Sequence, residues 1–296
     1  MRKIMILLAG AALVGAGIFW SITRPAVLPA DYLSGLTGDV MRGETVFWAA
    51  GCASCHAADK AEGAARLVLS GGRAFPSPFG TFRAPNISND PNQGIGSWSA
   101  LDLANAMQRG VSPDGSHYFP AFPYTSYSRA TGQDIVDLRQ FMATLPSDPT
   151  PNMAHEVGFP FNIRRSLGGW KFLFLRDNWQ VSGDLAEVEQ RGRYLVEALG
   201  HCGECHTPRN MLGGLQSGQW LAGAADPSGK GRIPNITPAR LKWSASDLVE
   251  YFTSGFTPDY DVVGGHMADV VQNLAQLPRE DRAAIAAYLA RVTPIE

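Results

Sequence analysis

The hydrophobic pattern of this chain begins with one unbroken apolar segment. From Ile4 to Trp20 no side chain is polar, and as a helix this segment would measure about 26 Å at ~1.5 Å per residue. Ser21 and Ile22 bring it close to the ~30 Å hydrocarbon thickness of a bilayer. Beyond it, apolar residues recur at helical spacing in shorter stretches. The pattern therefore predicts a membrane-length helix followed by a helical body.

The flanks of the apolar segment favour an uncleaved anchor over a cleaved signal peptide. Arg2 and Lys3 precede it and hold the N-terminus in the cytoplasm by the positive-inside tendency. The segment ends in bulky residues up to Trp20, and no small-x-small cleavage site follows. We therefore expect residues 1–24 to form a single-pass anchor in a bacterial inner (cytoplasmic) membrane, with the rest of the chain in the periplasm. A cleaved signal is the alternative.

The body is predicted to consist of helices and long loops. Apolar spacing predicts helices over four segments, namely 39–50, 133–145, 185–199 and 280–292. Ser99 and Ser244 are suited to cap the starts of two more helices. No segment shows convincing alternation with a period of two. Glycine (32 residues) and proline (20) form about a sixth of the chain, more than the usual share of roughly 12 %. We therefore expect an all-α fold with much loop.

Length and charge narrow the classes of function. A chain of 296 residues suggests about two domains at ~150 residues each. The net charge is −2 and only 18 % of residues are charged, whereas nucleic-acid-binding proteins usually carry a basic excess. No nucleic-acid partner is therefore expected. The same composition argues against a disordered acidic or basic protein.

All four cysteines fall in two pentapeptides with the pattern C-x-x-C-H. These are Cys52–His56 and Cys202–His206. The pattern is the attachment motif of c-type haem. Two thiols three positions apart can each add to one haem vinyl group, and the histidine that follows falls on the iron face. The motifs predict two covalently bound haems c, with His56 and His206 as iron ligands.

Two other interpretations of the cysteines are weaker. Disulfides suit an exported chain, but they give no reason for a histidine after each second cysteine. A zinc site could use two C-x-x-C pairs, but these pairs are 150 residues apart in the sequence, far beyond the spacing of a zinc ribbon. Haem attachment explains both the spacing and the histidines.

The two motifs belong to an internal repeat. Each copy has a helix before the motif, a Pro-Asn-Ile loop after it, a helix starting at Trp-Ser, a loop rich in glycine and proline, and a closing helix. The matched positions are Gly43 and Gly192, Pro85 and Pro234, Trp98 and Trp243, Gly110 and Gly255, and Phe141 and Tyr288. The chain thus reads as two copies of one unit of about 110 residues.

At this point the sequence resembles a known family, the cytochrome c subunits of bacterial membrane-bound alcohol and aldehyde dehydrogenases. The resemblance covers most of residues 38–296. It rests on both C-x-x-C-H motifs, both Pro-Asn-Ile segments, the run Pro120–Tyr124 and, most specifically, the run Leu199–Asn210. It implies two tandem class I cytochrome c domains over 35–148 and 185–296, joined by a linker over 149–184. Those subunits commonly carry three haems, whereas this chain has two motifs.

The resemblance also bears on the second axial ligand of each iron. It makes Met267 the thioether ligand of the second haem. The matching position in the first copy is Phe122, which cannot bind iron. His117, on the same loop, is our preferred ligand for the first haem. Met107, Met142 and an open position are the alternatives.

Other repeated residues are expected to contact the cofactor. Arg83 and Arg232 can each pair with a haem propionate, since a guanidinium matches a carboxylate in bidentate fashion. Trp98 and Trp243 are expected to close the haem crevices.

The repeated Pro-Asn pairs are the last expected contacts. The carbonyls of Pro85 and Pro234 are expected to accept a hydrogen bond from the iron-binding histidines and so fix the rings. Asn86 and Asn235 follow them and are counted with the haem-binding residues. In the linker, the apolar run Trp170–Leu175 is expected to pack between the two units, or else to form a docking surface for a partner or the membrane.

The function that these features predict is electron transfer without bond-making chemistry. The chain would be a membrane-anchored periplasmic dihaem cytochrome that takes single electrons from a periplasmic dehydrogenase. It would pass them to the respiratory chain, through quinone, a terminal oxidase or a soluble cytochrome. Two alternatives stay open: a dihaem enzyme of the peroxidase or thiosulfate-oxidising type, and the dihaem subunit of a haem–copper oxidase.

Overall fold

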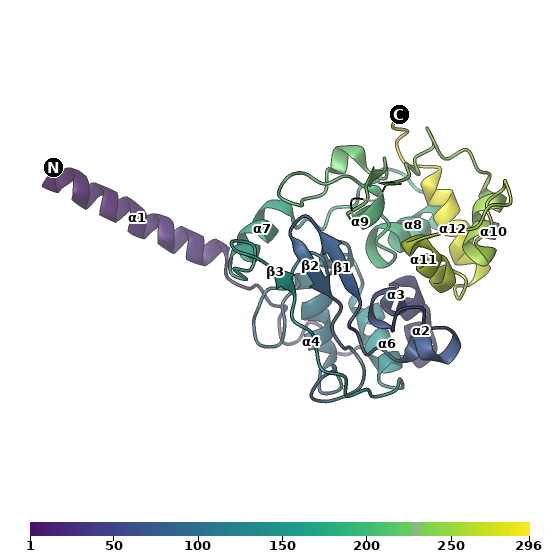
Figure 1. The fold of residues 1–296 in the computed structure, drawn as a ribbon, viewed down its shortest axis with the longest axis horizontal. Coiled ribbons are helices and arrows are strands. Elements are labelled where there is room, and N and C mark those ends of the chain that lie inside the picture. The colour runs from purple at the N-terminus through teal and green to yellow at the C-terminus, as the bar shows by residue number, and fades with distance from the viewer. Residues whose placement is uncertain (228, 230) are drawn as a thin grey trace.

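A computed structural model describes residues 1–227, 229 and 231–296. Its first helix, α1 (Arg2–Ile22), projects away from the body as a long rod (Figure 1). Every residue from Met1 to Ile22 is exposed. Among the described residues, α1 is the one helix long and apolar enough to cross a membrane. The body lies entirely on the C-terminal side of this helix (Figure 1).

The first half of the body is built mainly from short helices. They are α2 (Val40–Ala49), α3 (Cys52–His56), η1 (Gly63–Leu67), α4 (Ala100–Ala104), η2 (Asn105–Arg109), α5 (Tyr124–Tyr127) and α6 (Gly132–Met142). Asp39 caps α2 by accepting a hydrogen bond from the backbone of Arg42. Ser99 caps α4 in a capping box with Asp102, so the predicted helix start is confirmed.

The second half repeats this order. Its helices are α8 (Glu187–Arg193), η3 (Tyr194–Leu199), α9 (Gly203–His206), η4 (Ser217–Gln219), α10 (Ala245–Ser254), α11 (His266–Leu274) and α12 (Arg279–Leu289). Ser244 and Asp247 form a capping box at the start of α10, which confirms the second predicted cap. The segment of α11 was expected to be loop and is instead a helix of nine residues.

Each half is closed by the crossing of its first and last helices, α2 with α6 and α8 with α12. A glycine lies at each crossing because the backbones meet there. A Cβ on Gly43 would lie 2.0 Å from the carbonyl oxygen of Asp137, and a Cβ on Gly192 would lie 1.9 Å from that of Ala284. Phe141 and Tyr288 pack against these same glycines. The matched positions of the sequence repeat therefore hold equivalent helix contacts.

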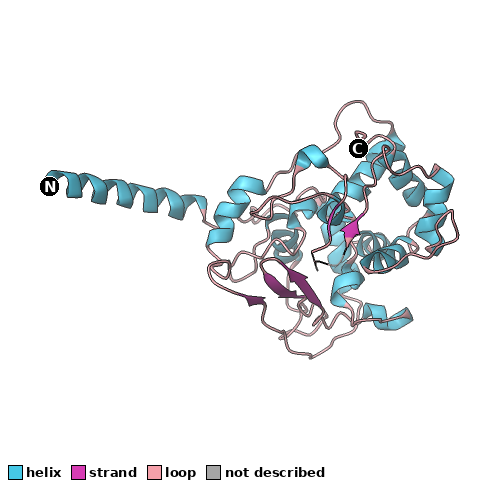
Figure 2. Ribbon diagram, turned by 45° about the horizontal axis from the view of Figure 1, so that its top comes forward, coloured by secondary structure: helices cyan, strands magenta, loops and turns pink. Residues whose placement is uncertain are grey.

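The fold is mostly helical, as predicted, but it also contains short strands that the all-α expectation left out. Three antiparallel strands form one sheet in the order β1 (Ala74–Ser77), β2 (Gly80–Arg83) and β3 (Glu156–Val157), and β4 (Ala224–Ala225) pairs with β5 (Arg232–Ile233). Ala74 is opposite Arg83, and Gly80 is opposite Val157. The strands are drawn in magenta in Figure 2. Strands of two to four residues are too short to show a two-residue period, so the sequence pattern missed them.

The linker contains a helix, α7 (Ser166–Phe174), that lies between α1 and the body (Figures 1 and 2). Trp170 packs edge-on against Tyr124 of the first half and donates a hydrogen bond to the carbonyl of Leu212 in the second half at 2.8 Å. The expected packing between the two halves is thus confirmed for this run. Phe172 and Leu173, however, stay exposed.

The two halves also contact each other directly. Helix α3 packs against α11, and α5 packs against η3. Arg73 forms an ion pair with Asp269 at 2.7 Å, and the guanidinium of Arg66 bonds to the side chain of Asn273. The attachment motif of the first half therefore lies at the contact between the halves.

Candidate haem-binding site

The two C-x-x-C-H motifs adopt the same local structure, each on a short helix. In both, a proline carbonyl lies 2.8 Å from the histidine Nδ1: Pro85 with His56, and Pro234 with His206. Because a carbonyl can only accept, Nδ1 must be the protonated nitrogen. This leaves the lone pair of Nε2 for a metal. Both contacts predicted between the prolines and the histidines are present in the structure.

No disulfide joins any of the four cysteines, all of which lie among the described residues. Loss of solvation raises the pKa of Cys52 and of Cys202 to about 12 and that of Cys55 to about 11. A charge on Cys205 further raises the pKa of Cys55, although nearby Arg73 lowers it. The two attachment motifs are thus close enough in space to interact electrostatically.

These residues fit a covalently bound haem. Each motif presents two thiols and an imidazole with a free Nε2 on one turn of helix. Four apolar side chains predicted to face the haems pack on the core but stay half-exposed, as expected of a surface that a macrocycle covers; they are Trp98, Phe122, Trp243 and Met267. The donor set and the apolar surface together match the cofactor predicted from the sequence.

Met267 lies in the first turn of α11, half-buried against the core. Helix α11 packs on α3 of the first half, so the candidate ligand of the second site is held by the contact between the halves. Its role as an iron ligand remains a prediction.

His117 is not placed to bind an iron, contrary to the expectation from the sequence. Its Nε2 lies 3.0 Å from the carbonyl oxygen of Thr23, and its Nδ1 lies 3.0 Å from Nζ of Lys171. The side chain is buried, and this burial is the main cause of its lowered pKa. Since both ring nitrogens already have partners, neither is left for a metal. A local sequence pattern could not reveal this, because Thr23 and Lys171 are distant in the chain.

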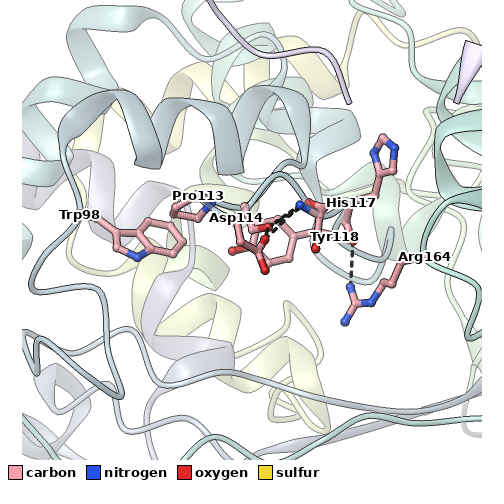
Figure 3. Close-up of a pocket in the computed structure, with 8 residues that line it drawn as sticks. Trp98, Pro113, Asp114, His117, Tyr118 and Arg164 are labelled. Atoms are coloured by element: carbon pink, nitrogen blue, oxygen red, sulfur yellow. Dashed lines mark hydrogen bonds between the residues drawn. The ribbon is translucent and has the colours of Figure 1, made fainter. Parts of the chain in front are cut away.

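A cavity of about 480 Å³ lies beside the loop that carries His117. Its lining includes Trp98, Asp114, Tyr118 and Arg164, and the His117 imidazole points away from it (Figure 3). The side chain of Arg164 donates a hydrogen bond to the backbone carbonyl of His117 at 2.9 Å. The His117 ring thus lies on the side of the loop away from the cavity, where it contacts Thr23 at the C-terminal end of α1.

The position in the first half that matches Met267 is occupied by aromatic rings. Phe122 is half-buried between Tyr118 and Tyr127, with ring centroids 5.8 and 5.7 Å away. The hydroxyl of Tyr124, which is buried nearby, has no hydrogen-bond partner among the described residues. The alternatives Met107 and Met142 lie in the hydrophobic core. The structure therefore assigns no second axial ligand to the first iron.

The two arginines predicted to bind propionates differ in their surroundings. Arg83 lies on β2 and forms an ion pair with Glu156 of β3. Arg232 lies on β5 and is exposed. A propionate contact remains a prediction for both. Trp243 packs against Tyr251 at 5.1 Å, and Trp98 lines the cavity of the first half.

The side chains of the two asparagines form hydrogen bonds within the protein. The side-chain nitrogen of Asn86 donates to the carbonyls of Asp148 and Thr150, and that of Asn235 donates to the carbonyl of Ile295. Each asparagine therefore ties its proline loop to the segment after the closing helix. They hold the proline carbonyl in place, and their place among the haem-binding residues remains a prediction.

The sequence analysis missed Glu204, which lies inside the second motif. Its carboxylate accepts hydrogen bonds from Thr125 and Ser126 of the first half and pairs with Arg209. Burial tends to raise the pKa of Glu204, but Arg209 and these hydrogen bonds lower it overall. A charged residue between the two cysteines of a haem motif is visible in the sequence and could have pointed to this position. Through its hydrogen bonds, Glu204 joins the second motif to the loop region of the first half.

Comparison with known proteins identifies relatives along the whole chain. The Cytochrome c family model matches residues 40–146. A protein of Cereibacter sphaeroides named "Diheme cytochrome c-type" is 58 % identical over 293 residues, which cover 98 % of this chain and 99 % of the relative.

More distant relatives are parts of dehydrogenases. The fructose dehydrogenase cytochrome subunit of Gluconobacter japonicus is 36 % identical over 86 % of this chain, and the cytochrome c subunit of the quinone alcohol dehydrogenase of Gluconobacter oxydans is 33 % identical over 84 %. The chain spans 52 % and 54 % of the length of these two proteins. The paired attachment motifs, their equivalent geometry and the full-length relative lead to one conclusion: the chain belongs to the dihaem c-type cytochromes.

Proposed function

We propose that this chain is a membrane-anchored carrier of single electrons with two tandem haem domains, over 35–148 and 185–296, joined by a linker over 149–184. It would receive electrons from a periplasmic dehydrogenase and deliver them to quinone, a terminal oxidase or a soluble cytochrome. The observation that carries the proposal is the pair of equivalent sites, each with two thiols and a histidine held by a proline carbonyl. Haem bound there supplies a one-electron redox centre.

The chain's own residues would orient and shield the two centres. The carbonyls of Pro85 and Pro234 fix the tautomer and the ring plane of the iron-binding histidines. Trp98 and Trp243 lie directly before the N-cap serines of α4 and α10, so they occupy equivalent positions in the two halves. No general base or nucleophile is needed for electron transfer.

Direct exchange between the two haems is supported by the contact between the halves. Ser54, inside the first motif, receives a hydrogen bond from Asn273 of α11 at 2.7 Å. Glu204, inside the second motif, receives hydrogen bonds from Thr125 and Ser126 of the first half. Each motif is thus anchored to the opposite half, which favours a short and fixed separation of the two centres.

Retention of α1 as a membrane anchor is supported by the junction at its C-terminal end. Thr23 is fully buried, and Arg165 donates hydrogen bonds to its hydroxyl at 2.9 Å and to the carbonyl of Trp20 at 2.7 Å. The guanidinium of Arg165 also lies 3.9 Å from the centre of the Trp20 ring. Gly168 approaches so closely that a Cβ there would lie 2.5 Å from Thr23. Cleavage near residue 24 would remove these partners of Arg165 and the Thr23 carbonyl that bonds to His117.

A second candidate function rests on the first haem alone. Since His117 faces Thr23 and Lys171, the first iron has no assigned second ligand. A dihaem enzyme of the peroxidase type needs an iron with an open axial position where a substrate can bind. An electron carrier, or the dihaem subunit of an oxidase, does not need an open position. Binding of cyanide or carbon monoxide to the first haem, measured by absorbance, separates the enzyme from the two carriers.

The test of the main proposal counts haems and locates the protein. Denatured protein should retain two covalent haems per chain in a pyridine haemochrome assay, and the double variant Cys202→Ala, Cys205→Ala should retain one. The mature protein should keep Arg2 and Lys3 and fractionate with membranes. A mature chain that begins after residue 24 and stays in solution would contradict the anchor, and a count of zero haems would end the proposal.

A further inference from the structure

Several large apolar side chains remain exposed around the point where α1 joins the body. We call this surface the basal patch; its residues are Phe159, Phe161, Phe172, Leu173, Met211 and Leu212. Their exposed fractions range from 47 % for Phe161 to 95 % for Met211. A cluster of this kind on a soluble body indicates an interaction surface. None of these residues is among those predicted to bind haem, and all of them stay exposed where the two halves pack together.

The residues of the basal patch come from three segments, which are held together by contacts between their neighbours. Trp170 of α7 donates a hydrogen bond to the carbonyl of Leu212, and Phe174 packs so closely on Gly214 that a Cβ there would lie 2.3 Å from the ring. Phe79, at the tip of the β1–β2 hairpin, contacts Phe161 edge-on at 5.1 Å. It also approaches Gly213, where a Cβ would lie 3.2 Å from its ring.

The basal patch adjoins the end of α1 directly. Helix α7, which carries Phe172 and Leu173, packs on Thr23 through Gly168 and on Trp20 through Arg165. Both ribbon views place α7 beside the base of α1 (Figures 1 and 2). When α1 spans a bilayer, Trp20 lies at the outer interface, where tryptophan is enriched. The patch then begins at the level of the lipid headgroups.

Basic residues border this apolar surface. Arg24 follows α1, and Arg176 follows α7; both are exposed. Exposed apolar side chains flanked by arginines are typical of segments that lie in the membrane interface, where the apolar groups reach the acyl boundary and the cations meet anionic headgroups. The charge and the continuity with α1 favour lipid over a protein partner as the occupant.

We propose that the basal patch is a second membrane contact, through which the body rests on the outer surface of a bilayer containing anionic lipid. This inference depends on the proposed anchoring by α1. The body would then be held by two contacts, one through the bilayer and one on its surface, and it could not swing freely about the end of α1.

The test uses the full haem-loaded chain in liposomes of phosphatidylcholine and phosphatidylglycerol with a lipid-soluble diazirine probe. After photolysis and digestion, labelling should appear in α1 and in peptides that contain Phe172, Leu173, Met211 and Leu212. The internal control is the loop around Tyr260, which is 89 % exposed and lies before α11, on the side of the body away from α1 (Figure 1). That loop should stay unlabelled.

A pair of variants tests the assignment more sharply. The double variant Phe172→Glu, Leu173→Glu should reduce labelling at Met211 and Leu212 several-fold while α1 stays labelled. Phe256→Glu, at a site of similar exposure (51 %) near Tyr260, should change nothing. A folded state is checked by the absorbance spectra of the haems in each variant.

The outcomes separate the two proposals. Labelling of α1 without labelling of the basal patch would overturn the surface contact and leave the anchor intact. Labelling of neither would overturn the anchor as well. A patch that lipid leaves unlabelled, but that a co-purified dehydrogenase shields from a water-soluble label, would be a protein interface and would equally overturn the proposal.

Discussion

The two halves of this cytochrome share their scaffold but differ beside the iron. Both have a glycine at the helix crossing, a proline carbonyl on the histidine and a serine-capped helix at Trp-Ser. At the matched position that is predicted to face the iron from the other side, the second half has Met267, whereas the first half has Phe122 packed among tyrosines. The fold therefore constrains the attachment side of the haem much more tightly than the ligand side, where the two sites can diverge in redox chemistry.

The largest expected effect tests whether the shared helix crossing is essential in both halves. Gly43→Ala and Gly192→Ala each place a Cβ about 2 Å from a backbone carbonyl, which a rigid helix pair cannot absorb. We expect each to lower the free energy of unfolding by on the order of 4 kcal/mol or more, or to prevent folding. Gly218→Ala, where nothing lies within 4 Å, is the control. Chemical denaturation measures the free energy of unfolding of all three variants. If only one of the two crossing variants loses much stability, the two helix crossings are not equivalent.

The second prediction concerns the difference at the iron. Met267→Ala should abolish the weak near-infrared band of a methionine-ligated ferric haem and lower the potential of one haem, because a thioether favours reduced iron. Phe122→Met should add a second such band by making the first half resemble the second. Spectroscopy and a redox titration measure both. If Met267→Ala leaves the band intact, another residue ligates the second iron.

A smaller effect is expected at His117. His117→Ala should leave both haem spectra unchanged but cost roughly 1–3 kcal/mol of stability, because the buried carbonyl of Thr23 and the amine of Lys171 lose a partner. Thermal unfolding and absorbance spectra are the measurements. Conversion of one haem to a high-spin form would restore His117 as an iron ligand.

The smallest expected effect concerns how the stability of the fold depends on pH at one buried carboxylate of the first half. Burial would raise the pKa of Asp137, but hydrogen bonds from Arg42, Gln133 and the backbone of Asp39 outweigh it and keep the pKa below its usual value. A carboxylate with a lowered pKa stabilises the fold above its unfolded pKa, and this stability is lost as the pH falls through the folded value. Asp137→Asn should therefore cost about 1–2 kcal/mol at neutral pH.

The same variant should flatten the dependence of stability on pH below about pH 4. Asp281→Asn removes the corresponding acidic partner of Arg191 in the second half and serves as the comparison. Denaturation at several pH values measures both variants. If Asp137→Asn leaves the dependence of stability on pH unchanged, the carboxylate of Asp137 does not stabilise the fold in this way.

Local signals predicted much of this fold, and non-local contacts account for the errors. Ser99 and Ser244 cap helices through residues only three positions away, so their roles could be derived from the sequence. Strands β1 and β2 are four residues each and carry no readable period. The role of His117 depends on partners from α1 and α7 that are 94 and 54 residues away in the chain, which no local pattern specifies.

The helices around Met267 and in the linker were missed for related reasons. Helix α11 begins at His266, directly after two glycines that indicated a loop. Helix α7 contains Gly168 and Gly169, which weaken any helical prediction, and it is stabilised by packing against Thr23 and Tyr124. Tertiary contacts thus overrode local preference at both places.

The polar contacts between the halves have a consequence for how the molecule unfolds. Arg66, Arg73 and Glu204 each bond across this contact, and Tyr194 bonds to Asp134 across it as well. Two domains joined only by a linker would melt in separate steps and could be separated by limited proteolysis. Here the attachment motifs themselves form part of the shared interface, so damage to one haem site should spread to the other. The two halves should therefore melt as a single cooperative unit.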